Sequence, residues 1–207
     1  MQNESGKTAV HFAVASRNTD LVRMLAIECV ADLNVRDSSH TSPLHLACHR
    51  GVKDIIRILL LREDIQVCGQ NCYGRSALDY ACGHEDMEVD IVQALLDREA
   101  DPTEQGCAGL NAIHCASSAG NVAVLRVLLA YGGMSAALTY DNNGYNAVHH
   151  ALYNGRYSAL FFLCQRSVQH ALYRFFSGRL LGVVPTMVCI TATMVLVAAA
   201  VAAGPSL

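Results

Sequence analysis

Histidine and cysteine are the residue types in this sequence with the greatest capacity for metal or nucleophilic chemistry, and the chain contains nine of each. His45 and His49 stand four positions apart, a spacing that can place two imidazoles on one face of a helix for zinc binding. The residues between them are Leu46, Ala47 and Cys48, so the glutamate that serves as the base of a metalloprotease is absent. We therefore expect no catalytic zinc at this pair.

Cys68, Cys72, Cys107 and Cys115 form the nearest approach to a structural metal site. Structural zinc needs four convergent ligands, usually with a short spacing within each pair. Cys107 and Cys115 are expected on opposite sides of a turn, so the two pairs have no reason to converge. The number of cysteines is odd, and they lack the tight spacing of a small secreted domain. We expect free thiols in a reducing compartment and no bound metal.

Other signals of catalysis are weak. The triplet Gly6-Lys7-Thr8 resembles the end of a phosphate-binding loop, but the first glycine of that motif would fall at Met1 and no strand precedes it. The sequence has no glycine-rich cradle and no paired carboxylates, so it predicts no catalytic residue, no cofactor and no small-molecule substrate. The net charge of -3 offers no basic surface for nucleic acid. We expect a non-enzymatic protein.

A repeat organises most of the chain, and its five starting positions are Thr8, Ser42, Ser76, Asn111 and Asn146. Successive starts are 34, 34, 35 and 35 residues apart, a period typical of stacked repeats. Each start is a residue type whose side-chain oxygen can cap a helix, and Ala or Pro follows in the first turn. A second apolar run follows in every unit. Each unit is therefore predicted to be a helix–turn–helix with a loop.

The second repeat carries the clearest motif, Ser42-Pro43-Leu44-His45-Leu46-Ala47 followed by Gly51, and the pattern resembles the ankyrin repeat over residues of about 3–165. The resemblance implies an all-α solenoid with β-hairpin loops, in which the recurring histidines, His11, His45, His114 and His149, are structural. It also implies protein binding through the loop tips and the concave face of the first helices. Two departures occur in the third repeat: Asp79 replaces the histidine, and the helix junction at 83–88 is longer.

Partner-binding candidates follow from the register of the first helices. Residues four, seven, eight and eleven positions after each start are expected to face the concave surface, and the candidates among them are His49, Arg50, Lys53, Tyr80, His84, Tyr153 and Asn154. Tyrosine and arginine are frequent at binding hot spots, which favours Arg50, Tyr80 and Tyr153. The alternative is that several of the seven pack against a neighbouring repeat. The acidic stretch from Glu85 to Asp90 is either a solvated junction or a patch that attracts a basic partner.

The sequence after the repeats changes character. Residues 166–179 have apolar side chains at helical spacing and a basic opposite face, which predicts an amphipathic helix that either caps the last repeat or lies on a membrane surface. Residues 180–203 contain no Asp, Glu, Lys, Arg, His, Asn or Gln over 24 positions. A helix of that length reaches about 36 Å, enough to cross a hydrocarbon core of about 30 Å. We predict a transmembrane helix there; a helix packed on the stack and a disordered tail are the alternatives.

Composition and flanking charge agree with this division of the chain. Hydrophobic residues make up 52% and charged residues only 16%, whereas about 25% of the residues of a typical soluble domain are charged. The apolar surplus is concentrated in residues 180–203. Arg166, Arg174 and Arg179 precede the predicted span, and this bias places the repeats on the cytoplasmic side of the membrane.

These features predict three regions: an ankyrin-repeat domain over 1–165, an amphipathic basic linker helix over 166–179 and a membrane span over 180–203. The expected function is a non-enzymatic scaffold that displays a concave surface to protein partners. It is expected at a membrane with its repeats facing the cytoplasm; a cytoplasmic location is the alternative. The alternative function is the cytosolic regulatory portion of a longer polytopic membrane protein, such as an ion channel or an ankyrin-bearing palmitoyltransferase.

Overall fold

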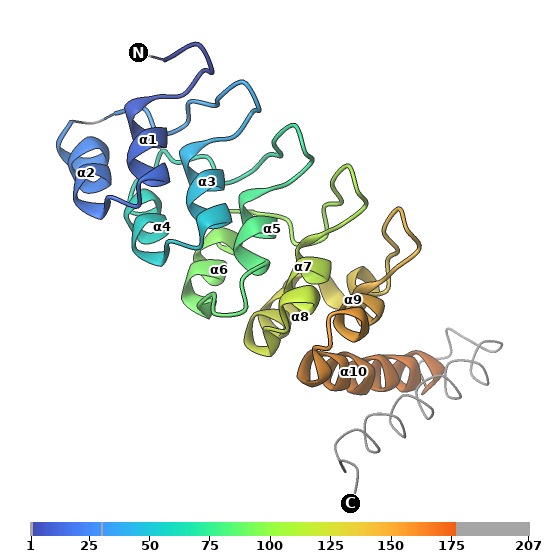
Figure 1. The fold of residues 1–207 in the computed structure, drawn as a ribbon. Coiled ribbons are helices and arrows are strands. Elements are labelled where there is room, and N and C mark those ends of the chain that lie inside the picture. Colours follow the sequence, from blue (N-terminus) through green and yellow to red (C-terminus); the bar gives the residue numbers. More distant parts are fainter. Residues whose placement is uncertain (1, 30, 177–207) are drawn as a thin grey trace, which may run out of the picture.

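The computed structural model describes residues 2–29 and 31–176, which form a row of helix pairs (Figure 1). The first helices of the repeats are α1 (Ala9–Ala15), α3 (Pro43–Arg50), α5 (Ala77–Cys82), α7 (Ala112–Ala119) and α9 (Ala147–Tyr153). The second helices are α2 (Thr19–Arg23), which continues as a π-helical turn over Met24–Glu28, α4 (Lys53–Leu60), α6 (Val89–Leu96), α8 (Val122–Ala137) and α10 (Tyr157–Phe176). The predicted all-α architecture is confirmed for these residues.

The first helices begin where the sequence pattern predicts, because their cap residues satisfy free N–H groups of the first turn. The side chains of Ser42, Ser76 and Asn111 each accept a hydrogen bond from the backbone N–H three residues later. Helices α3 and α7 end at Gly51 and Gly120, whose φ angles of 64° and 82° lie in the left-handed region. Glycine adopts this region without steric cost, so it ends both helices cleanly.

The loops between repeats end in tight tips that project from one side of the row (Figure 1). In the third tip the N–H of Asn71 donates to the carbonyl of Arg75 at 3.0 Å, and an equivalent bond closes the other four tips. The predicted β-hairpin loops are thus closed by backbone hydrogen bonds. The described residues nevertheless contain no strand, and their one isolated bridge joins Gln70 and Ser76.

The third and fourth tips approach each other at two glycines. Gly74 has a φ of 66°, and a Cβ added there would lie 2.2 Å from the backbone nitrogen of Cys107. A Cβ on Gly106 would lie 1.8 Å from the carbonyl oxygen of Gly74. Both distances are far below van der Waals contact, so a larger residue at either position would force the tips apart.

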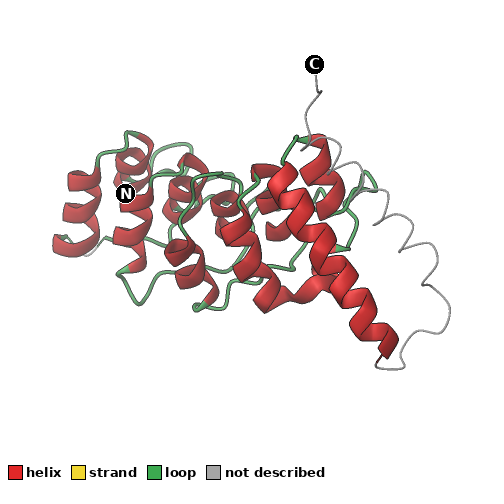
Figure 2. Ribbon diagram, turned by 90° about the horizontal axis from the view of Figure 1, so that it is seen from below, coloured by secondary structure: helices red, strands yellow, loops and turns green. Residues whose placement is uncertain are grey.

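The helices form two layers with the core between them (Figure 2). First helices contact first helices along the row, and second helices contact second helices. The core is built from large apolar side chains that are at most 1% exposed, among them Leu44, Ile55, Leu78, Ile91, Ile113 and Leu125. Burying one such side chain contributes about 1.5–3 kcal/mol. Because each repeat buries its apolar faces against its neighbours, stability belongs to the stack rather than to a single repeat.

The last helix differs from the prediction at residue 165. Helix α10 runs without interruption from Tyr157 to Phe176, so the predicted boundary between the repeat domain and the linker helix falls inside it. The sequence offers no Gly or Pro between these residues that would end the helix. Leu163 is fully buried and Ser167 is 7% exposed, and α10 contacts both α8 and α9. Part of the predicted linker therefore packs on the repeats.

None of the helices in the described part of the chain is both long enough and apolar enough to cross a membrane. The predicted span over 180–203 lies outside the described residues, together with the end of the predicted linker helix. The membrane span stays a prediction from sequence.

Candidate functional site

A groove with a volume of about 570 Å³ runs over the first helices of the second to fifth repeats. Its floor contains His49 from α3, Tyr80 from α5, His114 from α7 and His150 from α9. We call this surface the inner groove; loop-tip and junction residues complete its walls, namely Tyr73, Arg75, His84, Glu85 and Arg156. Four consecutive repeats therefore share one concave surface, and three of the predicted candidates, His49, Tyr80 and His84, line it.

Recurring histidines tie the repeats together beneath this surface. The ring of His45 lies 2.7 Å from the hydroxyl of Ser42 through Nδ1 and 3.0 Å from the carbonyl oxygen of Gly69 through Nε2. His114 repeats the arrangement, with Nε2 3.0 Å from the carbonyl oxygen of Thr139. Burial lowers the pKa of both rings, so they are neutral and donate from Nε2 to the carbonyl. The structural role implied for the recurring histidines is confirmed for His11, His45 and His114, each of which contacts a carbonyl of the next repeat, whereas His149 is exposed and contacts its own cap, Asn146.

Asp79 interrupts the series in the third repeat. Its carboxylate accepts the N–H of Ser76 at 2.9 Å and so caps α5, but an ionised carboxylate has no proton to donate to the next loop. His114 reaches the carbonyl of Thr139, which lies 25 residues later. A histidine at position 79 would by the same spacing reach the carbonyl of Glu104. Asp79 is 3% exposed, and burial raises its pKa to about 6 against the opposing effects of Ser76 and Arg75. The third and fourth repeats are thus joined without a histidine bridge.

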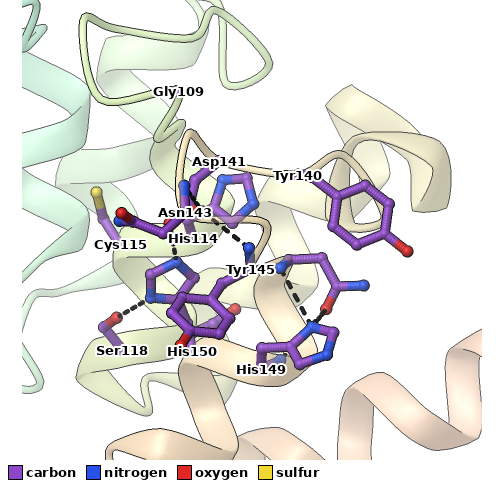
Figure 3. A network of polar contacts seen from close by, with 12 residues as sticks. Gly109, His114, Cys115, Ser118, Tyr140, Asp141, Asn143, Tyr145, His149 and His150 are labelled. Carbon is purple, nitrogen blue, oxygen red and sulfur yellow. Dashed lines mark hydrogen bonds and ion pairs between the residues drawn. The ribbon is translucent and has the colours of Figure 1, made fainter.

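A hydrogen-bonded chain of Ser118, His150 and Asp141 lies at one end of the inner groove (Figure 3). The His150 ring lies 3.3 Å from the Ser118 hydroxyl through Nδ1 and 3.0 Å from the carboxylate through Nε2. These residue types match a hydrolase triad, but Ser118 sits in the last turn of α7, where the helix carbonyls disfavour an oxyanion. Asp141 also accepts the N–H groups of Asn143 and Tyr145 at 2.9 and 2.8 Å. These hydrogen bonds join α7, α9 and the fifth loop tip.

The acidic stretch from Glu85 to Asp90 is matched by cations of other repeats. The pairs are Glu85 with Arg156 at 2.8 Å, Asp86 with Lys53 at 2.9 Å, Glu88 with Arg57 at 2.6 Å and Asp90 with Arg57 at 3.0 Å. Hydrogen bonding to the cation lowers the pKa of Asp86 and of Asp90, so both stay ionised. The structure favours a solvated junction held by ion pairs over an acidic patch that attracts a basic partner. Lys53, one of the candidates, belongs to this network.

Four of the candidates, His84, Asn154, Arg50 and Tyr153, fall into two groups by their contacts. Nε2 of His84 lies 2.9 Å from a carbonyl oxygen in α3, so the longer third junction reaches back to the second repeat. Nδ2 of Asn154 donates to a hydroxyl of α7 at 3.4 Å. Arg50 and Tyr153, by contrast, are exposed at the ends of α3 and α9. His84 and Asn154 join neighbouring repeats, and all seven candidates stay predictions as partner-binding residues.

Tyr73 and Arg75 are among the groove residues that the sequence-based candidates do not include. They lie three residues and one residue before the cap Ser76, whereas the register considered only positions after a cap. The hydrogen bond that closes the tip between Asn71 and Arg75 holds them beside the first helices. The position next to the cap was the signal that could have identified them.

Cysteines form no metal site in the residues that the structure describes. Seven of the cysteines there have free thiols, namely Cys29, Cys48, Cys68, Cys72, Cys82, Cys107 and Cys115. No group of three or more His, Cys, Asp or Glu side chains in that part could hold an ion. Burial raises the pKa of Cys48 to about 12 and that of Cys115 to about 11. Both are therefore protonated thiols at neutral pH, with little nucleophilic character.

Known proteins share this repeat pattern. A family model described as Ankyrin repeats (3 copies) matches residues 11–106 and 88–172. The chain is 28% identical over 159 residues to the transient receptor potential cation channel subfamily A member 1 of Homo sapiens, covering 74% of this chain and 14% of the channel. It is 31% identical over 142 residues to the B-cell lymphoma 3 protein homolog of Mus musculus, covering 67% of this chain and 31% of that protein. It is 29% identical over 131 residues to the neurogenic locus notch homolog protein 1 of Danio rerio, covering 63% of this chain and 5% of that protein.

Proposed function

The chain belongs to the ankyrin-repeat family, and from this premise we propose that its repeat stack is a protein-interaction module that binds a segment of a partner protein in the inner groove. The observation that carries the proposal is the groove itself, to which the first helices of four repeats contribute side chains. Tyrosine and arginine, the residue types enriched at binding hot spots, stand in its walls and floor as Tyr73, Arg75 and Tyr80.

Hydrogen bonds within the repeat stack support a rigid binding surface. Among the described residues, every buried side-chain nitrogen and oxygen has a hydrogen-bond partner. The histidine bridges and the ion pairs between repeats hold the groove walls in place before a partner arrives. A preorganised surface loses little conformational entropy on binding, so its contacts translate more fully into affinity.

A matched pair of tyrosine variants tests groove binding. Short random peptides are selected against the full chain in mild detergent, and their affinities are measured for Tyr80→Ala and Tyr131→Ala. Both tyrosines make a side-chain hydrogen bond through their hydroxyl, but Tyr80 lines the groove whereas Tyr131 lies on the second-helix layer. We expect a loss of about tenfold or more for Tyr80→Ala alone. Equal losses, or selected peptides that ignore Tyr80, would contradict the proposal.

The module is proposed to act without catalysis. The ankyrin-repeat family is typically non-enzymatic. In the inner groove His84 and His114 contact backbone carbonyls and His150 contacts two side chains. The triad-like Ser118 lies in the last turn of α7, where the helix carbonyls disfavour an oxyanion. The groove therefore fits recognition of a partner better than turnover of a substrate.

We further propose that residues 180–203 hold the module at a membrane, with the repeats in the cytoplasm. The support is the sequence of that segment, which runs for 24 residues without Asp, Glu, Lys, Arg, His, Asn or Gln and follows Arg166, Arg174 and Arg179. Carbonate extraction of membranes should release a chain that ends at Phe176 and retain the full chain. Ending at Phe176 preserves α10, which packs on the repeats. Release of both chains would refute the anchor.

A second candidate function is the cytosolic regulatory portion of a longer membrane protein. The observation in its favour is the similarity to a cation channel, of which the matched region is 14%. Sequencing the full-length transcript distinguishes the two candidates. Further apolar spans after residue 207 would support the regulatory portion, whereas a stop codon there would support the anchored module.

A further inference from the structure

We propose that the inner groove recognises an acidic side chain, Asp or Glu, of the partner segment through Arg75. This inference rests on the proposed binding of a protein segment and adds the chemistry of that segment. Arg75 stands directly before the cap of α5, and its backbone N–H donates to the Asn71 side chain at 3.1 Å. The closed tip therefore fixes the root of the arginine side chain. Its guanidinium reaches across to the next repeat, where one nitrogen lies 2.9 Å from the sulfur of Cys115.

In the described part of the chain the guanidinium of Arg75 makes no direct ion pair with a carboxylate. Two arginines line the groove, and Arg156 is paired with Glu85 at 2.8 Å. Within the described residues no carboxylate oxygen lies within 4.0 Å of the nitrogens of Arg75. Its acceptor is the thiol of Cys115, which is uncharged and accepts hydrogen bonds only weakly. A guanidinium has five N–H donors in a planar fork, so most of its hydrogen-bonding capacity is left for a ligand.

The two acids that line the groove, Asp79 and Glu85, make no direct ion pair with this guanidinium. Asp79 is 3% exposed and its carboxylate is held by the N–H of Ser76 at 2.9 Å. Glu85 is engaged by Arg156. Arg75 therefore acts on Asp79 through space without a direct ion pair, and a partner segment that brings a carboxylate would supply the direct contact that the guanidinium lacks. A carboxylate matches the planar fork with two parallel hydrogen bonds, which is stronger than a single neutral contact.

Aromatic rings flank the arginine and indicate what accompanies the acid. Tyr73 belongs to the same loop tip and is 64% exposed. Tyr80 lies in the floor with its ring centroid 4.8 Å from that of His49 in an edge-on contact. Rigid rings of this kind bury apolar side chains at a low cost in conformational entropy. The ligand that fits is thus a segment with one acidic residue beside an apolar or aromatic residue.

A double-mutant cycle between peptide and groove tests the proposal. Peptides selected against the full chain in mild detergent are compared with copies in which the acidic residue is replaced by its amide, using wild type, Arg75→Gln and Arg23→Gln. Arg23 is exposed in α2 and does not line the groove, so Arg23→Gln is a control that removes one positive charge elsewhere on the surface. We expect the amide peptide to bind wild type and Arg23→Gln about tenfold more weakly than the acid, and to bind Arg75→Gln as well as the acid does. Thermal melting of each variant shows that the fold is intact.

Each other outcome contradicts a defined part of the reasoning. Selected peptides without a shared acidic position, or an acid-to-amide effect that persists in Arg75→Gln, would overturn the carboxylate site while leaving groove binding in place. A phosphoserine peptide that binds more tightly than the acid peptide would replace a carboxylate by a phosphate as the ligand and overturn the proposal. Failure to select any peptide would contradict the proposed function itself. If Arg75→Gln does not fold, Arg75→Lys takes its place, because lysine keeps the charge but lacks the planar fork. If the ratio of acid-peptide to amide-peptide affinity in Arg75→Lys equals that of wild type, a bidentate contact is refuted.

Discussion

Replacing Asp79 with asparagine is expected to stabilise the protein at neutral pH. Asp79 is a buried carboxyl in a position where the other repeats carry a histidine, and burial raises its pKa from 3.8 to about 6. The folded protein therefore binds this proton more tightly than the unfolded chain does. The contribution of Asp79 to stability is greatest below about pH 4 and falls as the pH rises through about 6.

The magnitude follows from the size of the shift. A difference of about two pKa units corresponds to about 3 kcal/mol in the free energy of unfolding, because one unit is worth about 1.4 kcal/mol. The amide introduced by Asp79→Asn would keep an acceptor oxygen for the N–H of Ser76 and gain an N–H group that can donate to the next loop. The variant should therefore exceed wild type by up to about 3 kcal/mol at about pH 7.5 and by little at about pH 4.

Urea unfolding followed by far-UV circular dichroism, at several pH values, measures this difference. The difference in the free energy of unfolding between the variant and wild type is taken at each pH, so the contributions of the other titrating acids cancel. Asp86→Asn is the matched control, since hydrogen bonding to Lys53 lowers the pKa of Asp86 and its replacement should weaken the protein at neutral pH. A difference between wild type and Asp79→Asn that does not change between about pH 4 and 7.5 would refute the reasoning.

Three further predictions concern the stack and its thiols. Gly144→Ala and Gly74→Ala both place a side chain at a positive φ, but of the two only Gly74 has backbone within 2.2 Å of the new Cβ. Gly74→Ala should therefore lower the melting temperature more than Gly144→Ala does. Equal losses would show that the tips can separate. Arg57→Ala should lower the melting temperature by removing the ion pairs between α4 and α6, and less so in concentrated salt; a loss independent of salt would point to packing instead. Iodoacetamide followed by peptide mass spectrometry should label exposed Cys72 in the native protein but Cys82 only after unfolding, because burial raises the pKa of Cys82; early labelling of Cys82 would indicate local opening.

The helix pairs and their starts were predictable because their signals lie within one repeat. A cap such as Ser42, the first-turn proline Pro43 and the stop at Gly51 are read from ten consecutive residues. The structural histidines were predictable from the family pattern, and the hydrogen bond from His45 to the carbonyl of Gly69 bears this out. The last helix was predicted as two elements, the second helix of the fifth repeat and a linker helix from residue 166, whereas α10 runs through residue 165 as one helix. Helical propensity without a Gly or Pro continues a helix even when the repeat pattern has ended.

The groove was only partly predictable, because its composition depends on neighbouring repeats. The register after each cap named His49, Tyr80 and His84, which line the groove, but it did not include the loop position that carries Arg75. The acidic stretch could not be interpreted without its partners. Glu85 is paired with Arg156, which lies 71 residues further along the chain.

By itself, the sequence determined the period of the repeat, the cap at each helix start, the two-helix unit and the family to which the chain belongs. These properties arise from hydrogen bonds and apolar patterns within about ten residues of one another. Tertiary structure decided which charges are matched, how strongly Asp79 is buried and that Arg75 lines a shared groove without a direct carboxylate partner. Stacking brings together residues that are one or two repeats apart, and desolvation and pairing depend on those distances rather than on sequence order.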